Sequence, residues 1–522
     1  MIKEFRLDEL NSGDKTVADF LRKHEIRLIL PCGGTGVCGK CSVKVLFFHR
    51  EKILKTFDFP ACQYTMDKLL KSIPAGSDCI RFDIPEDSVI KSQKLHQSAS
   101  DGRPYLAAVD LGSTTIETAA LSLDGEVIGS ERCRNPQVSY GADVISRIKA
   151  ASESMIAASD MQRLAESTIR GSLEKLSARY SLAGLPEKIA IAGNTTMGHL
   201  LDGQDVSPLG QAPFDPGDIS LKDISKVFFT DKRPVILLPG ISTYVGGDIT
   251  SGIFDLDIDR SDKPQMLIDL GTNGEMALGD RNGIWVTSTA AGPAFEAANI
   301  SCGVPGIPGA VKRVTFKGQT AHLTLIPWDK ELSKLPPGVR MQEELRLRAK
   351  RPAGICGSGL ISAVSGMKKA GIIDDTGAFT SDEWRKYGFK LWKPSPATRG
   401  ESPVVITQDD IHELLLAKSA VRSGIEILIR SYGTTPEKIF LAGGFGSALT
   451  IEDAVSIGIF PEELSSHIVA AGNTSLKGAI KFLKNDSDET RHRLAAIKNL
   501  SHEIVLGDDS DFEDLFIRHM SF

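Results

Sequence analysis

The sequence lacks a long hydrophobic run, and it has few cysteines for its length. No apolar stretch approaches the roughly 18 residues that cross a bilayer. The first residues, Met-Ile-Lys-Glu-Phe, are charged and lack the apolar core of a secretory signal peptide. Eight cysteines in 522 residues argue against a disulfide scaffold. We therefore expect a cytoplasmic protein in a reducing compartment, with no membrane partner.

Charge of one sign is also scarce. The formal net charge is −6, and lysine and arginine are spread along the chain. Nucleic-acid binding depends on a concentrated basic patch, so we expect no nucleic-acid partner. The length of 522 residues is sufficient for about three or four domains with large buried cores.

Four of the cysteines lie close together near the start of the chain. Three stand in the glycine-rich segment Pro-Cys-Gly-Gly-Thr-Gly-Val-Cys-Gly-Lys-Cys, and the fourth follows after a gap of 20 residues. Such a loop can bring three thiolates around one side of a small inorganic core, which a separate segment then closes, as in a 2Fe–2S ferredoxin. The predicted metal ligands are Cys32, Cys38, Cys41 and Cys62.

Two other uses of these thiols stay open. Cys38 and Cys41 form a Cys-x-x-Cys pair, which could also hold zinc or act as a redox dithiol. Zinc sites more often pair two such units, whereas here the last ligand stands alone. The pattern favours the 2Fe–2S cluster and predicts an electron carrier. Cys79 falls outside the pattern, and we expect it to be a buried small apolar residue.

Residues 1–90 are predicted to form a ferredoxin-like (β-grasp) α+β domain. Strand-like alternation is present at residues 2–7, 42–48 and 79–85, and residues 16–24 have apolar side chains at helical spacing. Residues 91–103 are polar, with an Asp-Gly turn, and are predicted to be a linker.

From residue 104 onwards strands and helices alternate, and one pattern occurs twice. Each copy is an apolar strand ending in Asp-Leu-Gly-Ser/Thr, a second strand, a tight Asp-Gly or Asn-Gly turn and a third strand. The two aspartates, Asp110 and Asp269, are 159 residues apart. The repeat predicts two similar α/β lobes facing a cleft, lobe 1 at residues 104–262 and lobe 2 at residues 263–522.

The two repeated loops have the composition of phosphate- and magnesium-binding turns. Their glycines let backbone N–H groups approach phosphate oxygens, and their hydroxyl groups add donors. The aspartate at the strand end would bind Mg²⁺ directly or through water. One such loop alone could be a purely structural turn, but two in matching contexts favour nucleotide binding. The predicted residues are the catalytic Asp110 and the phosphate-binding Gly112, Ser113, Thr114, Thr115, Gly271, Thr272 and Asn273.

Further glycine loops lie where a nucleotide cleft would need them. Residues 192–196 and 441–446 each follow an apolar strand, and residues 354–359 precede a helix expected to start near Leu360. Backbone donors there could meet a ribose or a phosphate. Each loop could equally be a tight strand-to-helix turn. The predicted nucleotide-binding residues in these loops are Asn194, Gly354, Gly357, Ser358, Gly443 and Gly444.

Asp248 stands in the glycine loop Val-Gly-Gly-Asp and is the second catalytic candidate. A carboxylate there could position the attacking water or hold the metal. The alternative is that it caps the start of a helix. Glu296 is a weaker candidate.

The motifs, taken in order, resemble a known family. The two Asp-x-Gly loops and a late Ala-Gly-Gly-Phe-Gly loop resemble the actin, sugar-kinase and heat-shock-chaperone ATPase superfamily, whose two ribonuclease-H-like lobes surround an ATP cleft. Gly-Asn-Thr-Thr-Met, Ala-Gly-Pro-Ala-Phe-Glu and Gly-Ile-Cys-Gly-Ser-Gly, together with the cysteine motif, narrow the likeness. The chain resembles the reductive activators of corrinoid proteins over nearly its whole length.

The resemblance implies an ATP-hydrolysing iron–sulfur activase. It would pass one electron from a 2Fe–2S cluster to Co(II) of a corrinoid protein and so regenerate Co(I) for methyl transfer. The implied cofactors are the 2Fe–2S cluster, ATP and Mg²⁺. The implied partners are a corrinoid methyl-transfer protein and a low-potential electron donor. Members of the family carry an extra domain where this chain has only the linker at residues 91–103, and a homodimer is left open.

Two other functions fit parts of the sequence. An activator of a radical dehydratase also couples an actin-like ATPase to an iron–sulfur cluster, but such activators share a 4Fe–4S cluster between two chains and lack a ferredoxin domain. A redox-sensing ATP-binding module would use the cluster to gate nucleotide affinity without catalytic reduction. Little ATP turnover, even with a partner present, would favour the sensor.

Overall fold

The computed structural model forms two compact units. Unit 1 comprises residues 1–247 with 479–491, and unit 2 comprises residues 248–478 with 492–522. None of the helices in the described part of the chain is long and apolar enough to cross a membrane. The structure describes residues 1–10, 14–24, 26–30, 41–50, 52–85, 89–90, 102–228, 233–297, 299–327, 352–394, 403–443 and 449–522.

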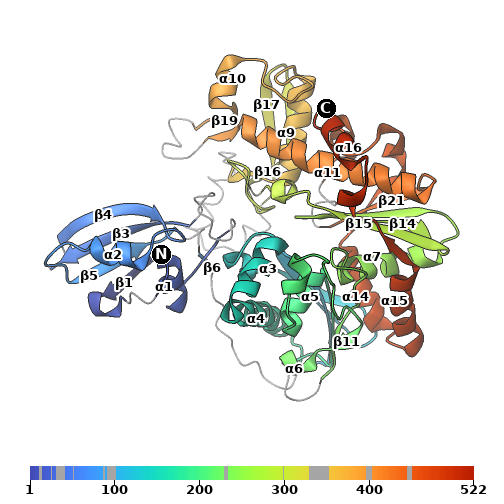
Figure 1. Cartoon of the computed structure of the whole chain (residues 1–522), viewed down its shortest axis with the longest axis horizontal. Coiled ribbons are helices and arrows are strands. Elements are labelled where there is room, and N and C mark those ends of the chain that lie inside the picture. Colours follow the sequence, from blue (N-terminus) through green and yellow to red (C-terminus); the bar gives the residue numbers. More distant parts are fainter. Residues whose placement is uncertain are drawn as a thin grey trace. The chain divides into compact units, whose positions relative to one another are not determined.

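Unit 1 begins with a four-stranded antiparallel sheet (Figure 1). The order of its strands is β1-β5-β3-β4, and the strands predicted near residues 2, 42 and 79 are confirmed with small differences at their ends. Most of the predicted linker lies outside the described residues, so it stays a prediction. The strands are β1 (Ile2–Arg6), β3 (Ser42–His49), β4 (Lys52–Pro60) and β5 (Cys79–Asp83), with the short pair β2 (Arg27–Leu28) and β6 (Val89–Ile90) beside them in the chain.

This sheet has a core of its own, built against helix α1 (Val17–Lys23). Phe20 of the helix is buried and its ring lies 5.0 Å from that of Phe5 and 6.3 Å from that of Phe82. Phe5 and Phe82 point inward from neighbouring strands because side chains alternate along a strand. A second helix, α2 (Met66–Lys71), adds buried apolar side chains to the same core.

The rest of unit 1 is built on a six-stranded sheet. Three strands form an antiparallel meander, and two further strands continue the sheet in parallel on the side of the first strand. The order is β11-β12-β10-β7-β8-β9. The strands are β7 (Leu106–Leu111), β8 (Thr115–Leu121), β9 (Val127–Arg134), β10 (Lys188–Gly193), β11 (Lys222–Asp223) and β12 (Val235–Leu237).

Unit 2 repeats five strands of this topology in a second six-stranded sheet, whose sixth strand lies at the opposite edge and pairs in parallel with the last strand of the meander. Its order is β22-β21-β13-β14-β15-β23, with a meander of β13, β14 and β15 and parallel pairing of β13 with β21 and of β21 with β22. The repeat predicted from the sequence is therefore confirmed. The strands are β13 (Gln265–Leu270), β14 (Gly274–Asp280), β15 (Gly283–Thr289), β21 (Lys438–Ala442), β22 (Ile468–Gly472) and β23 (Ser501–Glu503).

Helices join the strands, which gives the predicted two-lobed, actin-like α/β fold after an N-terminal domain (Figure 1). Smaller sheets in unit 2 contain β16 (Ala310–Lys317), β17 (Thr320–Leu325), β18 (Gly354–Ile355), β19 (Phe389–Trp392) and β20 (Val404–Ile406). The main helices are α3 (Val144–Glu153), α4 (Met155–Tyr180), α5 (Thr195–Asp202), α7 (Gly247–Leu256), α9 (Gly357–Lys369), α11 (Gln408–Tyr432), α13 (Ile451–Ser456), α14 (Thr474–Lys484), α15 (Asp488–Leu500) and α16 (Phe512–Arg518).

A buried lysine of α11 contacts the C-terminal end of the chain. Only 1% of Lys418 is exposed, and its Nζ donates to the backbone carbonyl of Ser521 at 2.5 Å. The same Nζ lies 5.6 Å from the ring centroid of Phe522. Burial, with smaller contributions from the charges of Arg422 and Lys368, lowers the pKa of Lys418 to about 8.

Lys418→Met is expected to remove one pH dependence of stability. Between pH 8 and 10.5 the unfolded chain keeps the lysine proton while the folded chain loses it, so the free energy of unfolding of the wild type rises with pH through this window. The variant lacks this rise, so its stability relative to the wild type should fall by up to about 3 kcal/mol across the window. Urea unfolding at several pH values measures the difference. The exposed Lys263→Met is the control, and equal pH profiles for the two variants would contradict the prediction.

Candidate functional site

Two of the four predicted cluster ligands lie side by side in the described part of the chain. Cys41 precedes β3 and Cys62 follows β4, and antiparallel pairing of Ser42 with Pro60 brings these strand ends together. The two sulfur atoms are 3.2 Å apart, well beyond the ~2.05 Å of a disulfide bond. Both side chains are buried. Cys32 and Cys38 lie outside the described residues.

The geometry of this pair fits a tetrahedral metal ion. Two sulfur ligands of one tetrahedral metal ion, with metal–sulfur bonds of about 2.3 Å, would stand about 3.8 Å apart. Small rotations of the Cys41 and Cys62 side chains would reach that separation, and their role as ligands stays a prediction. Cys79 is partly exposed rather than fully buried, which corrects the expectation of a buried apolar residue. Burial, followed by the nearby carboxylate of Glu4, raises the pKa of the Cys79 thiol, so it is a poor source of thiolate.

The first phosphate loop turns tightly between β7 and β8. The Gly112 N–H donates to the Thr115 carbonyl at 3.1 Å, which closes the turn. A Cβ at Gly112 would lie 2.7 Å from that oxygen, so glycine is required there. Asp110, near the end of β7, pairs in register with Glu117 of β8. Residues 112–115 therefore form a tight turn, and their role in phosphate binding stays a prediction.

Buried donors hold three carbonyl oxygens of this loop. The Asn135 side-chain amide donates to the Gly112 carbonyl at 2.9 Å, and its backbone N–H donates to the Thr114 carbonyl at 2.8 Å. The Arg147 guanidinium donates to the Ser113 carbonyl at 2.6 Å. Asn135 and Arg147 are fully buried. Because a carbonyl dipole directed at a phosphate would repel it, bonding these oxygens to the protein interior favours an anion at the loop.

Sequence reasoning missed Asn135 and Arg147. Their contacts join segments that lie more than 20 residues from the loop, and spacing rules do not reach that far. The local signal was the Asn-Pro turn that follows the third strand of the meander.

Asn194 lies at the same edge of the sheet as the first loop. β10 runs parallel to β7, with Ala192 opposite Asp110 in the register, so the two strands end together. Ligands of α/β sheets bind at this carboxyl edge. The Asn194 side-chain oxygen accepts the Met197 N–H at 2.9 Å and so caps α5. Asn194 thus has a structural role, and its predicted role in nucleotide binding stays a prediction.

The second phosphate loop, between β13 and β14, has a similar closure. The Gly271 N–H donates to the Asn273 carbonyl at 2.9 Å. The Thr272 hydroxyl donates to the Glu296 carboxylate at 2.8 Å, and the Asn273 side-chain amide donates to Glu275 at 3.2 Å. The structure therefore brings Glu296, the weaker candidate, to the loop.

Three carboxylates act on one another beside this second loop. Asp269 lies near the end of β13, Glu275 lies in β14, and Asp248 lies in the first turn of α7. Burial raises the pKa of Glu275 well above its usual range, and the negative charges of Asp248 and Asp269 raise that pKa further. A divalent cation would relieve this repulsion. Glu275, at 8% exposed, is a third residue that sequence reasoning left without a role.

Asp248 is already inside α7 rather than at its N-cap. The helix begins at Gly247, and one carboxylate oxygen of Asp248 accepts the Ile249 N–H at 2.9 Å. This hydrogen bond holds the Asp248 side chain close to the backbone of the first helical turn. Its predicted catalytic role stays a prediction.

Gly443 approaches the second loop from β21. Parallel pairing places Ala442 opposite Asp269, so Gly443 follows at the same edge. Its φ is +86°, and a Cβ there would lie 2.5 Å from a carboxylate oxygen of Asp269 and 3.0 Å from the Leu270 carbonyl. Gly444 lies outside the described residues.

Gly443→Ala is expected to destabilise unit 2 more than Gly433→Ala does. Both glycines have a left-handed φ, which costs an alanine about 1–2 kcal/mol. A Cβ at Gly433 would enter open space, whereas a Cβ at Gly443 adds a collision with Asp269 worth about 1–3 kcal/mol more. Chemical unfolding of the two variants measures the difference. Equal destabilisation would contradict the predicted close approach.

The predicted residues at 354–358 lie at the junction of β18 and α9. The helix begins at Gly357, three residues before the predicted start, and its N-cap is Cys356. The Ser358 hydroxyl donates to the Lys312 carbonyl at 3.2 Å. Gly354 has a φ of +148°, and a Cβ there would lie 2.6 Å from the Cys302 carbonyl. Packing alone therefore explains the residue types, and a role in nucleotide binding stays a prediction.

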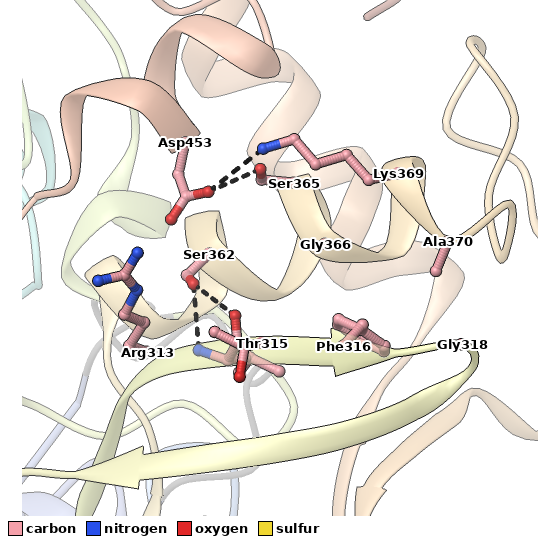
Figure 2. Close-up of a pocket in the computed structure, with 11 residues that line it drawn as sticks. Arg313, Thr315, Phe316, Gly318, Ser362, Ser365, Gly366, Lys369, Ala370 and Asp453 are labelled. Atoms are coloured by element: carbon pink, nitrogen blue, oxygen red, sulfur yellow. Dashed lines mark hydrogen bonds and ion pairs between the residues drawn. The ribbon is translucent and has the colours of Figure 1, made fainter.

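A hollow of about 380 Å³ lies between β16, α9 and α13, and none of the predicted site residues lines it (Figure 2). Its polar side chains bind one another. The Ser365 hydroxyl donates to Asp453 at 2.8 Å, and Lys369 lies 3.8 Å from the same carboxylate. The Ser362 hydroxyl accepts from the Val314 N–H at 3.0 Å and donates to the Val314 carbonyl at 2.9 Å. These contacts join the three elements.

Known proteins resemble the chain over most of its length. It is 27% identical to the corrinoid activation enzyme RamQ of Eubacterium limosum, over 98% of this chain and 97% of that protein. That alignment runs over 611 positions, so RamQ contains segments with no counterpart in these 522 residues. It is also 26% identical to the [Co(II) methylated amine-specific corrinoid protein] reductase of Methanosarcina barkeri, over 64% of this chain and 63% of that protein.

A solved structure shares the fold of the whole chain. The reductive activator for corrinoid,iron-sulfur protein has a TM-score of 0.69 and 24% sequence identity, and the match covers 98% of this chain and 96% of that one. The family model of the RACo middle region matches residues 105–261. The model of the C-terminal domain of RACo, the ASKHA domain, matches residues 263–522. The chain therefore belongs to the RACo family of reductive activators.

Proposed function

We propose that this protein uses ATP to return one electron to the cobalt of a corrinoid protein, which converts Co(II) into the Co(I) that methyl transfer requires. The observation that carries the proposal is the buried thiol pair Cys41 and Cys62 in the same chain as a duplicated phosphate-loop fold. Electron transfer needs a metal cluster, which the thiols would hold. ATP use needs a bound nucleotide, which the phosphate loops would hold. Relatives named for corrinoid activation match this chain over nearly its whole length.

The N-terminal domain would be the electron carrier. Cys32, Cys38, Cys41 and Cys62 would hold a 2Fe–2S cluster, which supplies one electron at a time when bound. Burial of Cys41 and Cys62 keeps water away from two of the ligand sulfurs. The strand pairing of β3 with β4 fixes the distance between these two ligands before a metal binds.

The two lobes would bind ATP and Mg²⁺. Asp110 would hold the metal beside the first loop, where Asn135 and Arg147 fix the carbonyl groups of residues 112–114. In the second loop, Thr272 and Asn273 are oriented by Glu296 and Glu275. We propose lobe boundaries at residues 104–262 and 263–522, after a ferredoxin domain at residues 1–90.

ATP is needed because the electron transfer is uphill. Plant-type clusters have potentials near −400 mV, and the Co(II)/Co(I) couple is expected to be lower. Each gap of ~59 mV costs about 1.4 kcal/mol for one electron. We infer that nucleotide binding and hydrolysis act on the docked corrinoid protein, for example on the axial ligand of cobalt, and raise its potential. The remaining partner is a low-potential electron donor, and the reaction belongs in a reducing, anaerobic cytoplasm.

Partner-stimulated ATP hydrolysis tests this assignment. ATP hydrolysis by the cluster-loaded protein should be faster when a Co(II) corrinoid protein is added. The reason is that the Co(II) form is the proposed substrate, and its reduction is coupled to ATP hydrolysis. The methylated form of the same corrinoid protein should give no rise. Equal hydrolysis with both forms would contradict the proposed coupling.

A further inference from the structure

A short buried turn, η3 (Pro136–Ser139), lies between the first phosphate loop and the N-terminal domain in unit 1. All four of its residues are buried. On the loop side, Asn135 directly precedes it and holds the carbonyls of Gly112 and Thr114. The Gln137 side-chain oxygen accepts from Asn135 at 3.1 Å and from Arg147 at 3.3 Å. The turn is therefore part of the support of the loop.

The same turn is bonded to the N-terminal domain. The Leu30 N–H donates to the Val138 carbonyl at 3.3 Å, and Leu30 directly precedes the predicted cluster loop. The guanidinium of Arg22, on α1, lies 4.6 Å from the ring centroid of Tyr140, which follows η3. This geometry is a cation–π contact.

An ion pair adds to the contact between the N-terminal domain and lobe 1 near η3. Arg27 donates through both terminal nitrogens to the two carboxylate oxygens of Asp160 on α4, one of them at 3.0 Å. The Tyr140 hydroxyl donates to the same carboxylate at 2.7 Å. Asp160 is 5% exposed, so solvent screens the pair weakly. Burial raises the pKa of Asp160, but the bonds from Arg27 and Tyr140 outweigh burial and hold that pKa below its usual range.

We propose that η3 couples the N-terminal domain to the nucleotide loop of lobe 1. Docking through Arg27, Asp160 and Tyr140 holds η3 in the arrangement in which Asn135 and Arg147 fix the loop. Nucleotide bound at the loop in turn strengthens the docking, since coupling between two sites is reciprocal. This inference rests on the proposed function, and it means that the electron carrier is held more firmly when nucleotide is present.

Asp160→Asn tests the coupling from the lobe side. The variant keeps the size of the side chain and an acceptor for Tyr140, but it loses the charge that pairs with Arg27 and with Arg163 of the same helix. Calorimetry on the full chain with Mg²⁺ and a non-hydrolysable ATP analogue should show a dissociation constant raised by roughly 2- to 30-fold. Glu166→Gln is the matched control, because Glu166 also lies on α4 but pairs with Arg170 of the same helix. The control should bind the analogue as the wild type does.

Arg27→Gln tests the coupling from the N-terminal domain. The residues of lobe 1 are unchanged in this variant, so a loss of nucleotide affinity would not come from a structural defect in the lobe. Arg27 lies far from the loop in sequence and its side chain is 23% exposed, so the fold should tolerate the change. We expect a loss of affinity no larger than in Asp160→Asn, which also loses the pair with Arg163. We expect no further loss in the double variant, because Arg27 has already lost its charged partner there. Unchanged affinity in Arg27→Gln, or additive losses, would overturn the coupling. A wild type that binds no nucleotide would instead overturn the proposed function.

Discussion

Cys41→Ser is expected to stop electron delivery while leaving ATP hydrolysis largely in place. The cluster needs soft thiolate ligands, and a serine oxygen is a poor replacement. Cys41 lies 3.2 Å from Cys62 at buried strand ends, so no other described cysteine takes its place without moving β3 or β4. Loss of an outer hydrogen-bond partner of a metal ligand already costs about 10–100-fold, so the rate of Co(I) formation should fall by at least about 100-fold.

Three measurements on the same preparation separate the two activities. Iron and sulfide content and visible absorbance report the cluster, Co(I) absorbance reports electron delivery, and phosphate release reports hydrolysis. Cys79→Ser is the matched control, because Cys79 lies on β5 of the same sheet but outside the ligand pattern. It should keep the cluster. A Cys41→Ser protein with the absorbance of the wild type would refute the ligand assignment.

Asp110→Ala is expected to give the opposite result, with an intact cluster and no ATP-dependent Co(II) reduction. Asp110 lies at the carboxyl edge of the sheet, beside the loop closed by Gly112 and Thr115. Removing its carboxylate removes the proposed Mg²⁺ ligand. Loss of one preorganised electrostatic group commonly costs about 100- to 1,000-fold in rate, and a drop of at least about 100-fold is expected here.

The control for this variant is Asp124→Ala. Asp124 belongs to the same meander, in the exposed turn between β8 and β9, so the change removes a carboxylate from the same sheet without touching the loop. It should reduce Co(II) as the wild type does. An Asp110→Ala protein that still reduces Co(II) in the presence of ATP would contradict the assignment of the first loop to Mg²⁺ and phosphate binding.

The repeated meander could be predicted because its signals are local. Each hairpin is specified by alternating apolar residues and a two-residue turn, such as Asp124-Gly125, and each loop follows its strand directly. The cysteine pair could be predicted for a similar reason. Cys41 and Cys62 flank two strands that pair with each other, so spacing along the chain determines proximity in space.

The support of the loops could not be predicted, because it comes from distant segments. Arg147 reaches the Ser113 carbonyl from α3, and the charge of Asp248 reaches Glu275 from α7. Residue type gives no hint of such contacts until the sheets are assembled. Burial also raises the pKa of Glu275, and the burial of one carboxylate in a strand cannot be predicted from the alternation of residues alone.

The position of the C-terminal helices is a further feature that could not be predicted from the sequence. The periodicity of residues 474–500 indicates helices but not the sheet that they accompany. In the structure, residues 479–491 belong to unit 1, where Asp486 pairs with Lys188 at 2.8 Å and Lys484 pairs with Glu126 at 3.1 Å. These partners are about 300 residues or more away in the chain, so only tertiary structure reveals them.

The most direct test of the account is anaerobic absorbance spectroscopy of a Co(II) corrinoid methyl-transfer protein. It is mixed with this protein and a low-potential reductant, with and without ATP. If the protein couples ATP to reduction of the cobalt, a Co(I) spectrum forms only when ATP is present. No Co(I) with a panel of corrinoid proteins, despite an intact cluster, would contradict it, as would Co(I) formed equally well without ATP.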